Sequence, residues 1–183
     1  MKSLYQIGQV PYREEFIGYG DQAIYNTVAK MKSIIQSSSK NPYVREWAKS
    51  IVAGVPVEDK QREAEAVFKF VQSNVRYTKD PLGWEYIQTP PVMLEDIRLY
   101  KEGKGDRPIG DCDDMTVLSL SLLRSIGFPV AIKVVSYNPE RKFGHVYGLV
   151  NIKGEWVPFD TVRPDKYMGW EAAGMTRVLE VKV

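Results

Sequence analysis

Hydrophobic residues in the first part of the chain recur at the three- and four-residue spacing of amphipathic helices. Residues 21–37 carry such a stripe and begin at Asp21, which can cap the helix. Residues 42–53 follow a polar break, and Pro42 suits the first turn of a second helix. A third stripe runs through residues 58–74 and consists of Ala66, Val67, Phe70 and Val71. The pattern therefore predicts three N-terminal helices.

The middle of the chain changes from an irregular segment to a strongly apolar one. Residues 77–108 are rich in proline and glycine and lack a helical period, which is typical of a long functional loop. From Cys112 to Gly127 the apolar residues occupy more than one helical face, which predicts a central buried helix that ends at the glycine. Asp111 stands at the cap position, and Asp114 stands where its capping-box partner belongs.

In the last third of the chain, hydrophobic and polar residues alternate, which is typical of β-strands. Four segments show it: 130–137, 145–153, 155–162 and 176–183. Helices come first and strands that can pair antiparallel come last. This order predicts an α+β fold, with the central helix packed on an antiparallel sheet.

The residues Lys153–Gly154 predict a tight hairpin between the second and third of these strands. In that register His145 lies opposite Val162, and Tyr147 lies opposite Asp160. Side chains alternate along a strand, so His145 and Asp160 become diagonal neighbours on one face of the pair. The other face is an apolar strip, made of Val146, Val150, Ile152, Val157 and Phe159.

Cys112 is the only cysteine in the chain and His145 the only histidine. A helix N-terminus favours a thiolate, whereas the neighbouring aspartates raise the pKa of a thiol. We therefore expect an imidazolium from His145 to stabilise the thiolate. A carboxylate such as Asp160 would hold the base in its tautomer and orientation, which is the logic of a thiol triad.

Composition narrows the class of protein. The chain has 183 residues, 44% of them hydrophobic, and a net charge of only +2, which offers no case for nucleic acid or an anionic membrane as a partner. No apolar run approaches the roughly 18 residues of a membrane helix, and the N-terminus lacks the features of a signal peptide. With one cysteine there is no internal disulfide. These features predict a single domain spanning residues 1–183 in a reducing compartment, most simply a bacterial cytoplasm.

Three stretches resemble the transglutaminase-like branch of the papain-like cysteine enzymes. They are "GDCDDMTVLSLSLLRSIGFPV", "GHVYGLV" and "WVPFDTV", in the order and strand placement of that family. The upstream "VRYTKDPLGWEYIQTPPVMLED" resembles the approach segment of bacterial and phage-associated members. We assign the core to residues 58–165, a helical part without a recognisable motif to 1–57, and a C-terminal strand region to 166–183.

The resemblance implies a papain-like core in which Cys112 is the nucleophile, His145 the base and acid, and Asp160 the orienting residue. It also implies an oxyanion hole that includes the backbone amide of Cys112. A further donor would come from the upstream loop, where Gln88 and Trp84 are both candidates.

A cation site is an alternative use of the three aspartates at the helix start, because animal transglutaminases need calcium. Asp111, Asp113 and Asp114 point in different directions from a helix start and lack the ligand spacing of a loop site. We therefore expect helix caps, no metal and no cofactor.

Two classes of function follow from the resemblance. The first is a thiol enzyme that attacks a protein or peptide amide and forms a thioester, which water hydrolyses or an amine converts to a cross-link. Protease or amidase activity is favoured over cross-linking, because small microbial members lack the accessory domains of the animal cross-linkers. The second is a catalytically silent binding or assembly module, in a phage setting. The sequence leaves the substrate and the oligomeric state open.

Overall fold

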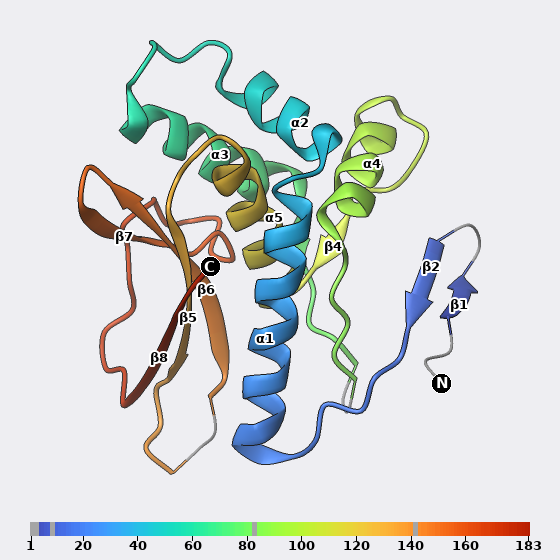
Figure 1. Cartoon of the computed structure of the whole chain (residues 1–183), viewed down its shortest axis with the longest axis vertical. Coiled ribbons are helices and arrows are strands. Elements are labelled where there is room, and N and C mark those ends of the chain that lie inside the picture. Colours follow the sequence, from blue (N-terminus) through green and yellow to red (C-terminus); the bar gives the residue numbers. More distant parts are fainter. Residues whose placement is uncertain (1–3, 8–9, 82–83, 141–142) are drawn as a thin grey trace.

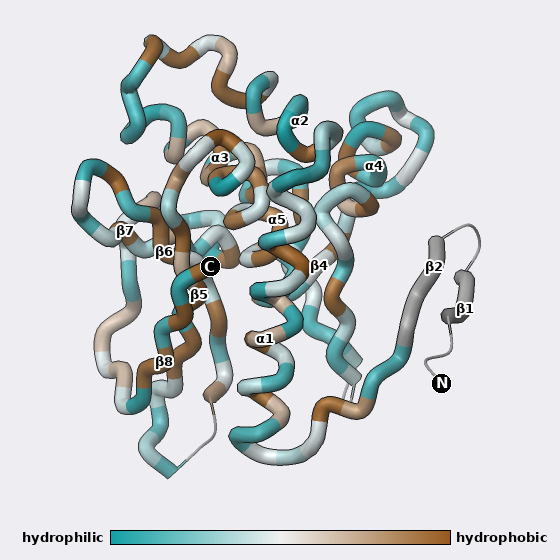
Figure 2. The backbone as a smooth tube through the Cα atoms, viewed as in Figure 1, coloured by the Kyte–Doolittle hydropathy of each residue, from teal (hydrophilic) through white to brown (hydrophobic). Residues whose placement is uncertain are grey.

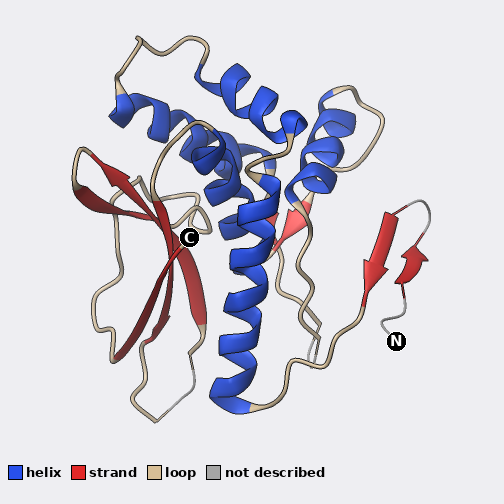
Figure 3. Ribbon diagram, viewed as in Figure 1, coloured by secondary structure: helices blue, strands red, loops and turns tan. Residues whose placement is uncertain are grey.

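The computed structural model describes residues 4–7, 10–81, 84–140 and 143–183. The helices lie on one side of a four-stranded sheet, so the helices form one layer and the sheet forms the other (Figures 1 and 3). The helices are α1 (Gly20–Ser38), α2 (Pro42–Val52), α3 (Lys60–Asn74), α4 (Pro90–Lys101) and α5 (Cys112–Ser125). The predicted α+β class is confirmed.

The main sheet contains the four strands expected from the alternating pattern. They are β5 (Val130–Ser136), β6 (His145–Ile152), β7 (Glu155–Phe159) and β8 (Arg177–Lys182). Their order across the sheet is β7-β6-β5-β8, with every neighbouring pair antiparallel. Strand β6, which begins at His145, therefore lies inside the sheet, and pairing with β5 and β7 on its two sides fixes its position.

Helix α5 is the centre of the molecule, as its sequence predicts. Twelve of its fourteen residues are buried, and it packs against α1, α2 and α3 on one side and β6 on the other. Figure 2 shows hydrophobic residues along this helix and along the strands beside it. Gly148 permits the close packing on β6, since a Cβ at this position would lie 2.6 Å from Leu120 Cδ2. Core packing therefore holds α5, which begins with Cys112, against β6, which begins with His145.

The prediction of an irregular segment over residues 77–108 is wrong in part, because α4 lies inside it. The two prolines that suggest a loop occupy its first turn, where a missing N–H has no cost. The helix buries three apolar residues, Met93, Leu94 and Ile97. What remains irregular is the segment before Pro90, in its described parts 78–81 and 84–89, and the turn after Lys101.

Two further details differ from the sequence pattern. Asp21 does not cap α1: the cap position is Tyr19, and Asp21 lies in the first turn, where it pairs with Arg177 at 2.7 Å. In α3 the buried stripe is shifted, because Ala64 and Phe68 are buried whereas Ala66 is only half-buried.

Among the described residues, four short strands lie outside the main sheet. An antiparallel hairpin of β1 (Leu4–Ile7) and β2 (Val10–Arg13) precedes α1, so the part of the chain at 1–57 is not wholly helical. It lies on the far side of the helices from the main sheet (Figure 1). Strands β3 (Arg76–Tyr77) and β4 (Ile109–Gly110) pair in parallel. None of the described helices has the length and apolar character required to cross a membrane.

The hairpin between β6 and β7 has the predicted turn, with Ile152 opposite Glu155. The ladder ends, however, at the pair Gly148 and Phe159. The reason is Asp160, whose Oδ1 accepts a hydrogen bond from the Val162 amide at 3.2 Å and turns the chain away from the strand. The predicted strand pairs of His145 and Tyr147 are therefore not formed.

Candidate active site

The start of α5 is held by the capping box that the sequence predicts. Asp111 Oδ1 accepts hydrogen bonds from the amides of Asp113 at 2.9 Å and Asp114 at 3.4 Å. Asp114 Oδ2 accepts in return from the Asp111 amide at 3.3 Å. These bonds satisfy amides that the helix itself leaves without partners. They fix Cys112 as the first residue of the helix.

Segments that precede α5 in the chain contact its first turn and hold it in place. The pairing of β3 with β4 places Tyr77 beside Gly110, two residues before Cys112. Gly110 leaves no room for a side chain, because a Cβ there would lie 2.9 Å from the Cβ of Asp114. Asp114 Oδ1 also accepts a hydrogen bond from the Gln88 amide at 2.7 Å. The nucleophile candidate is thus set on a rigid junction of helix, strand and loop.

His145 and Asp160 meet as the hairpin argument expects, although the ladder ends before them. Nε2 of His145 lies 2.8 Å from Asp160 Oδ2, and the carboxylate is almost fully buried. This contact occupies Nε2, so Nδ1 is the ring nitrogen that remains for proton exchange with a thiol or a leaving group. A buried carboxylate that fixes the ring in this way is the arrangement of a base with its orienting acid.

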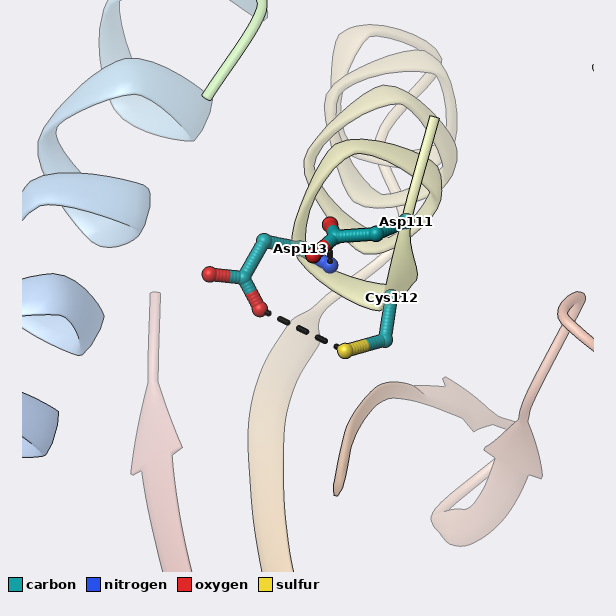
Figure 4. A group of neighbouring side chains, drawn as sticks. All are labelled: Asp111, Cys112 and Asp113. Atoms are coloured by element: carbon teal, nitrogen blue, oxygen red, sulfur yellow. Dashed lines mark hydrogen bonds between the residues drawn. The ribbon is translucent and has the colours of Figure 1, made fainter. Parts of the chain in front are cut away.

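The Cys112 thiol lies in an acidic environment near the start of β6. Its Sγ donates to Asp113 Oδ1 at 3.7 Å (Figure 4). Burial, then the charges of Asp113 and Asp111, hold the pKa of the thiol well above its ordinary value, and the backbone of Val146 offsets part of this rise. The aspartates thus act on the thiol as the sequence suggests. The predicted contact between Cys112 and His145 stays a prediction, since the thiol's hydrogen bond is to Asp113.

The model of the transglutaminase-like superfamily matches residues 45–161, which include all three triad candidates. The chain belongs to the transglutaminase-like superfamily. This membership supports a thiol enzyme as its general class. No curated protein sequence matches the chain.

Solved structures resemble this chain at low sequence identity. A candidate protease from Parabacteroides distasonis superposes with a TM-score of 0.56 at 10% identity over 73% of this chain, which spans only 26% of that protein. A candidate cysteine protease from Cytophaga hutchinsonii gives a TM-score of 0.47 at 18% identity, covering 82% of this chain and 53% of that one. LapG from Legionella pneumophila gives 0.44 at 16% identity, covering 81% and 80%.

Tyr77 lies beside the start of α5 and is not singled out by the sequence pattern. Its position follows from the strand pairing with Gly110, and its side chain is 37% exposed. Burial is the main reason that the pKa of its hydroxyl rises to about 12, and the nearby Cys112, Asp111, Asp113 and Asp160 contribute to the same rise. The hydroxyl therefore stays protonated at neutral pH and can donate a hydrogen bond within the site.

Gln88 and Trp84 have definite positions, but their oxyanion roles stay predictions. The Gln88 side chain donates to the carbonyl of Ile109 at 3.2 Å, and Gln88 lines an open cavity of about 700 Å³. Trp84 is 55% exposed and stacks on Tyr86, with ring centroids 6.1 Å apart.

The loop before α4 adds two carboxylates to the helix start, Asp80 and Glu85. Single ligand atoms of Asp80, Glu85 and Asp111 lie within 4.8 Å of one another, and those of Asp111, Cys112 and Asp113 do as well. Burial is the main reason that the pKa of Asp111 rises to about 6 and that of Asp114 to about 7, and it raises the pKa of Asp113 well above its ordinary value. The sequence pattern brings together only the aspartates of the helix start, so the approach of Asp80 and Glu85 comes from the tertiary fold.

Proposed function

We propose that this chain is a thiol-dependent acyl-transfer enzyme that acts on protein or peptide amide bonds through Cys112, His145 and Asp160. The observation that supports it best is the 2.8 Å contact between His145 Nε2 and the buried Asp160. This pair lies at the start of the strand on which the thiol-bearing helix packs. The family match covers all three residues.

The reaction begins with the thiol protonated, because its pKa is raised. His145 takes the proton as the sulfur attacks the amide carbon, and Asp160 stabilises the imidazolium that forms. The backbone amide of Cys112 donates to the oxyanion of the tetrahedral intermediate. His145 then protonates the leaving amine, which gives the thioester. Water resolves the thioester by hydrolysis, and an amine resolves it by transfer.

Hydrolysis is the favoured outcome of the two, as in a protease or amidase. The raised pKa of the thiol supports one alternative, a transglutaminase-like binding or assembly module without turnover. A thiol that stays protonated and hydrogen-bonded to Asp113 is a poor nucleophile unless the base removes its proton.

Thiol labelling separates these two functions. Because Cys112 is the only cysteine, the mass shift from iodoacetamide reports on this one sulfur. We expect wild type to react at neutral pH faster than His145→Ala by about tenfold or more, since the base contributes about 10²–10⁴-fold in general-base reactions. The control is Asp165→Ala, an exposed carboxylate outside the site, which leaves the rate unchanged. Equal, slow labelling in wild type and His145→Ala contradicts the enzyme and supports the silent module.

A further inference from the structure

The face of the main sheet that does not pack on α5 carries three polar side chains in contact, which we call the Glu171 cluster: Lys133, Tyr147 and Glu171. Lys133 on β5 lies directly opposite Tyr147 on β6. Both contact Glu171, which comes from the segment between β7 and β8. Figure 1 shows this segment on the side of the sheet away from the helices. The cluster therefore joins the sheet to the part of the chain that follows Asp160.

Glu171 is held by two hydrogen bonds to the same oxygen. Lys133 Nζ donates to Glu171 Oε1 at 2.8 Å, and the hydroxyl of Tyr147 donates to that oxygen as well. The Lys133 side chain is 12% exposed and Tyr147 only 2%. Hydrogen bonds to a carboxylate are shorter and stronger than those between neutral groups. The Tyr147 hydroxyl is thus fixed at its far end, away from the strand.

Tyr147 is also the neighbour of the proposed base. It stands two positions after His145 on β6, so both side chains leave the same face of the strand. Their ring centroids lie 5.6 Å apart, with the planes inclined by 31°. A ring that is itself fixed restricts the rotation of a ring that packs against it. The imidazole is therefore restrained by two contacts, the hydrogen bond to Asp160 and the packing on Tyr147.

Packing alone does not require the hydroxyl of Tyr147. The neighbours of this ring in the core of the outer face are apolar: Ala131, Val135, Leu149 and Met175. A phenylalanine would fill the same space without the cost of removing Lys133 and Glu171 from water. What the hydroxyl adds is a fixed direction for the ring. The ring contact through which that direction can affect the proposed chemistry is the one with His145.

We propose that Tyr147 and Glu171 are positioning residues for His145, an inference that rests on the proposed function. Glu171, anchored by Lys133, holds the Tyr147 hydroxyl. The fixed phenol ring then keeps the imidazole in the orientation in which Nε2 meets Asp160. This orientation leaves Nδ1 as the nitrogen that exchanges a proton in the proposed reaction. Both residues act through His145 and not on the substrate.

The first experiment observes the imidazole itself and needs no turnover. Because His145 is the only histidine, NMR of a sample labelled with ¹⁵N-histidine reports on one ring. We expect an Nε2–H signal that exchanges slowly with water, because the buried carboxylate of Asp160 accepts its hydrogen bond. Tyr147→Phe keeps the aromatic ring and removes the hydroxyl. It should speed this exchange about tenfold, the ratio that one hydrogen bond provides. An unchanged exchange rate overturns the proposal.

Variants of Glu171 trace the effect to the cluster. Glu171→Ala removes the acceptor and should speed the exchange as Tyr147→Phe does, whereas Glu171→Gln keeps an acceptor oxygen and should restore part of the protection. Combining Glu171→Ala with Tyr147→Phe should add nothing, because each change breaks the same hydrogen bond. Additive losses overturn the proposal. The matched control is Tyr167→Phe, a 70% exposed hydroxyl of the same segment, which should leave the exchange unchanged.

A backbone amide on the same strand separates positioning from a general loss of stability. Val150 lies further along β6 and is fully buried. Its amide should exchange at the wild-type rate in Tyr147→Phe and Glu171→Ala, because the proposal confines their effect to the imidazole. A rise at Val150 equal to the rise at the His145 ring would mean that the cluster only stabilises the fold, and this result overturns the proposal.

Turnover of a peptide amide then tests whether the restraint on His145 serves the reaction. In Tyr147→Phe, kcat should fall about tenfold while KM stays within about twofold, because a residue that acts through the base does not bind the substrate. A loss confined to KM overturns the positioning role. A wild type without turnover, but with the expected exchange rates, would contradict the proposed function and leave the restraint standing. Turnover together with a ring signal indifferent to Tyr147 and Glu171 would do the reverse.

Discussion

The carboxylates on α4 and those at the start of α5 belong to the same residue class but behave in opposite ways. On α4, Glu95 is half-exposed and hydrogen-bonded to Arg98 and Tyr43, which lower its pKa to about 2. At α5, burial raises the pKa of Asp111 to about 6 and that of Asp114 to about 7, and further carboxylates surround both. Glu95 therefore has a cationic partner in Arg98, whereas the carboxylates at the start of α5 have further carboxylates as neighbours.

This difference separates residues kept for the fold from residues suited to chemistry. Paired surface charges contribute little to stability and are easily replaced. A cluster of buried carboxylates with raised pKa values is unfavourable for folding, and such clusters mark functional sites. Capping of α5 explains why carboxylates occur at positions 111 and 114. It does not explain the carboxylates of Asp113 and Glu85.

The largest expected effect is the loss of turnover in variants of the triad. Cys112→Ala should abolish cleavage of a peptide amide, because the chain has no second thiol. Cys112→Ser and His145→Ala should be almost as severe, and Asp160→Ala should lose about two to four orders of magnitude. Rates are measured with and without an added primary amine. Full activity in Asp160→Ala would indicate a dyad, and activity in Cys112→Ala would exclude the mechanism.

The second effect is an unusual dependence of stability on pH. The folded protein holds the Asp111 and Asp114 protons up to about pH 6 and 7, whereas the unfolded chain releases them near the ordinary value of 3.8. The folded state therefore binds more protons between these values, so the free energy of unfolding falls as the pH rises through this window. We expect a decrease of about 2–4 kcal/mol between pH 5 and pH 8.

Thermal melts at constant ionic strength and with a chelator test this pH effect. Asp114→Asn should flatten the dependence, because the amide carries no proton to lose. Asp165→Asn is the matched surface control: hydrogen bonds from Lys166 and Arg163 lower the pKa of Asp165 to about 2, so it does not titrate in this window. Stability that rises from pH 5 to pH 8 in wild type would contradict the raised pKa values.

A smaller effect should follow from removing the cap of α5. At pH 5, below the pKa of about 6, Asp111→Ala loses the acceptor for two helix amides without relieving a buried charge. We expect a cost of about 0.5–2 kcal/mol in the free energy of unfolding. Asp111→Asn keeps an acceptor oxygen and should cost less. Identical denaturant midpoints for Asp111→Ala and wild type would mean that the cap does not contribute to stability.

The smallest effect is expected at the paired surface carboxylates. Arg98→Ala breaks the contacts to Glu95 at 2.7 Å and to Glu102 at 2.6 Å. Because these groups are exposed and screened by salt, the melting temperature should fall less than in Asp111→Ala, and the difference should shrink at high salt. A larger loss than in Asp111→Ala would reverse the comparison between α4 and α5.

The sequence by itself determined the features that depend on neighbours in the chain. The capping box around Cys112, the termination of α5 just before Gly127 and the turn at Lys153–Gly154 all follow from local backbone chemistry. The hydrophobic period likewise located the central helix and the four strands. These signals are short-range, so the residues that produce them lie within a few positions of the structure they define.

Only the tertiary structure decided which distant groups meet. It placed a helix where paired prolines suggest a loop, because packing of Met93 and Ile97 outweighs the weak local signal. It ended the β6–β7 ladder before Asp160 and still brought that carboxylate to His145. It also carried Glu85 to Asp113, 28 positions further along the chain. Local patterns contain no information on such contacts, because burial and the closure of long loops create them.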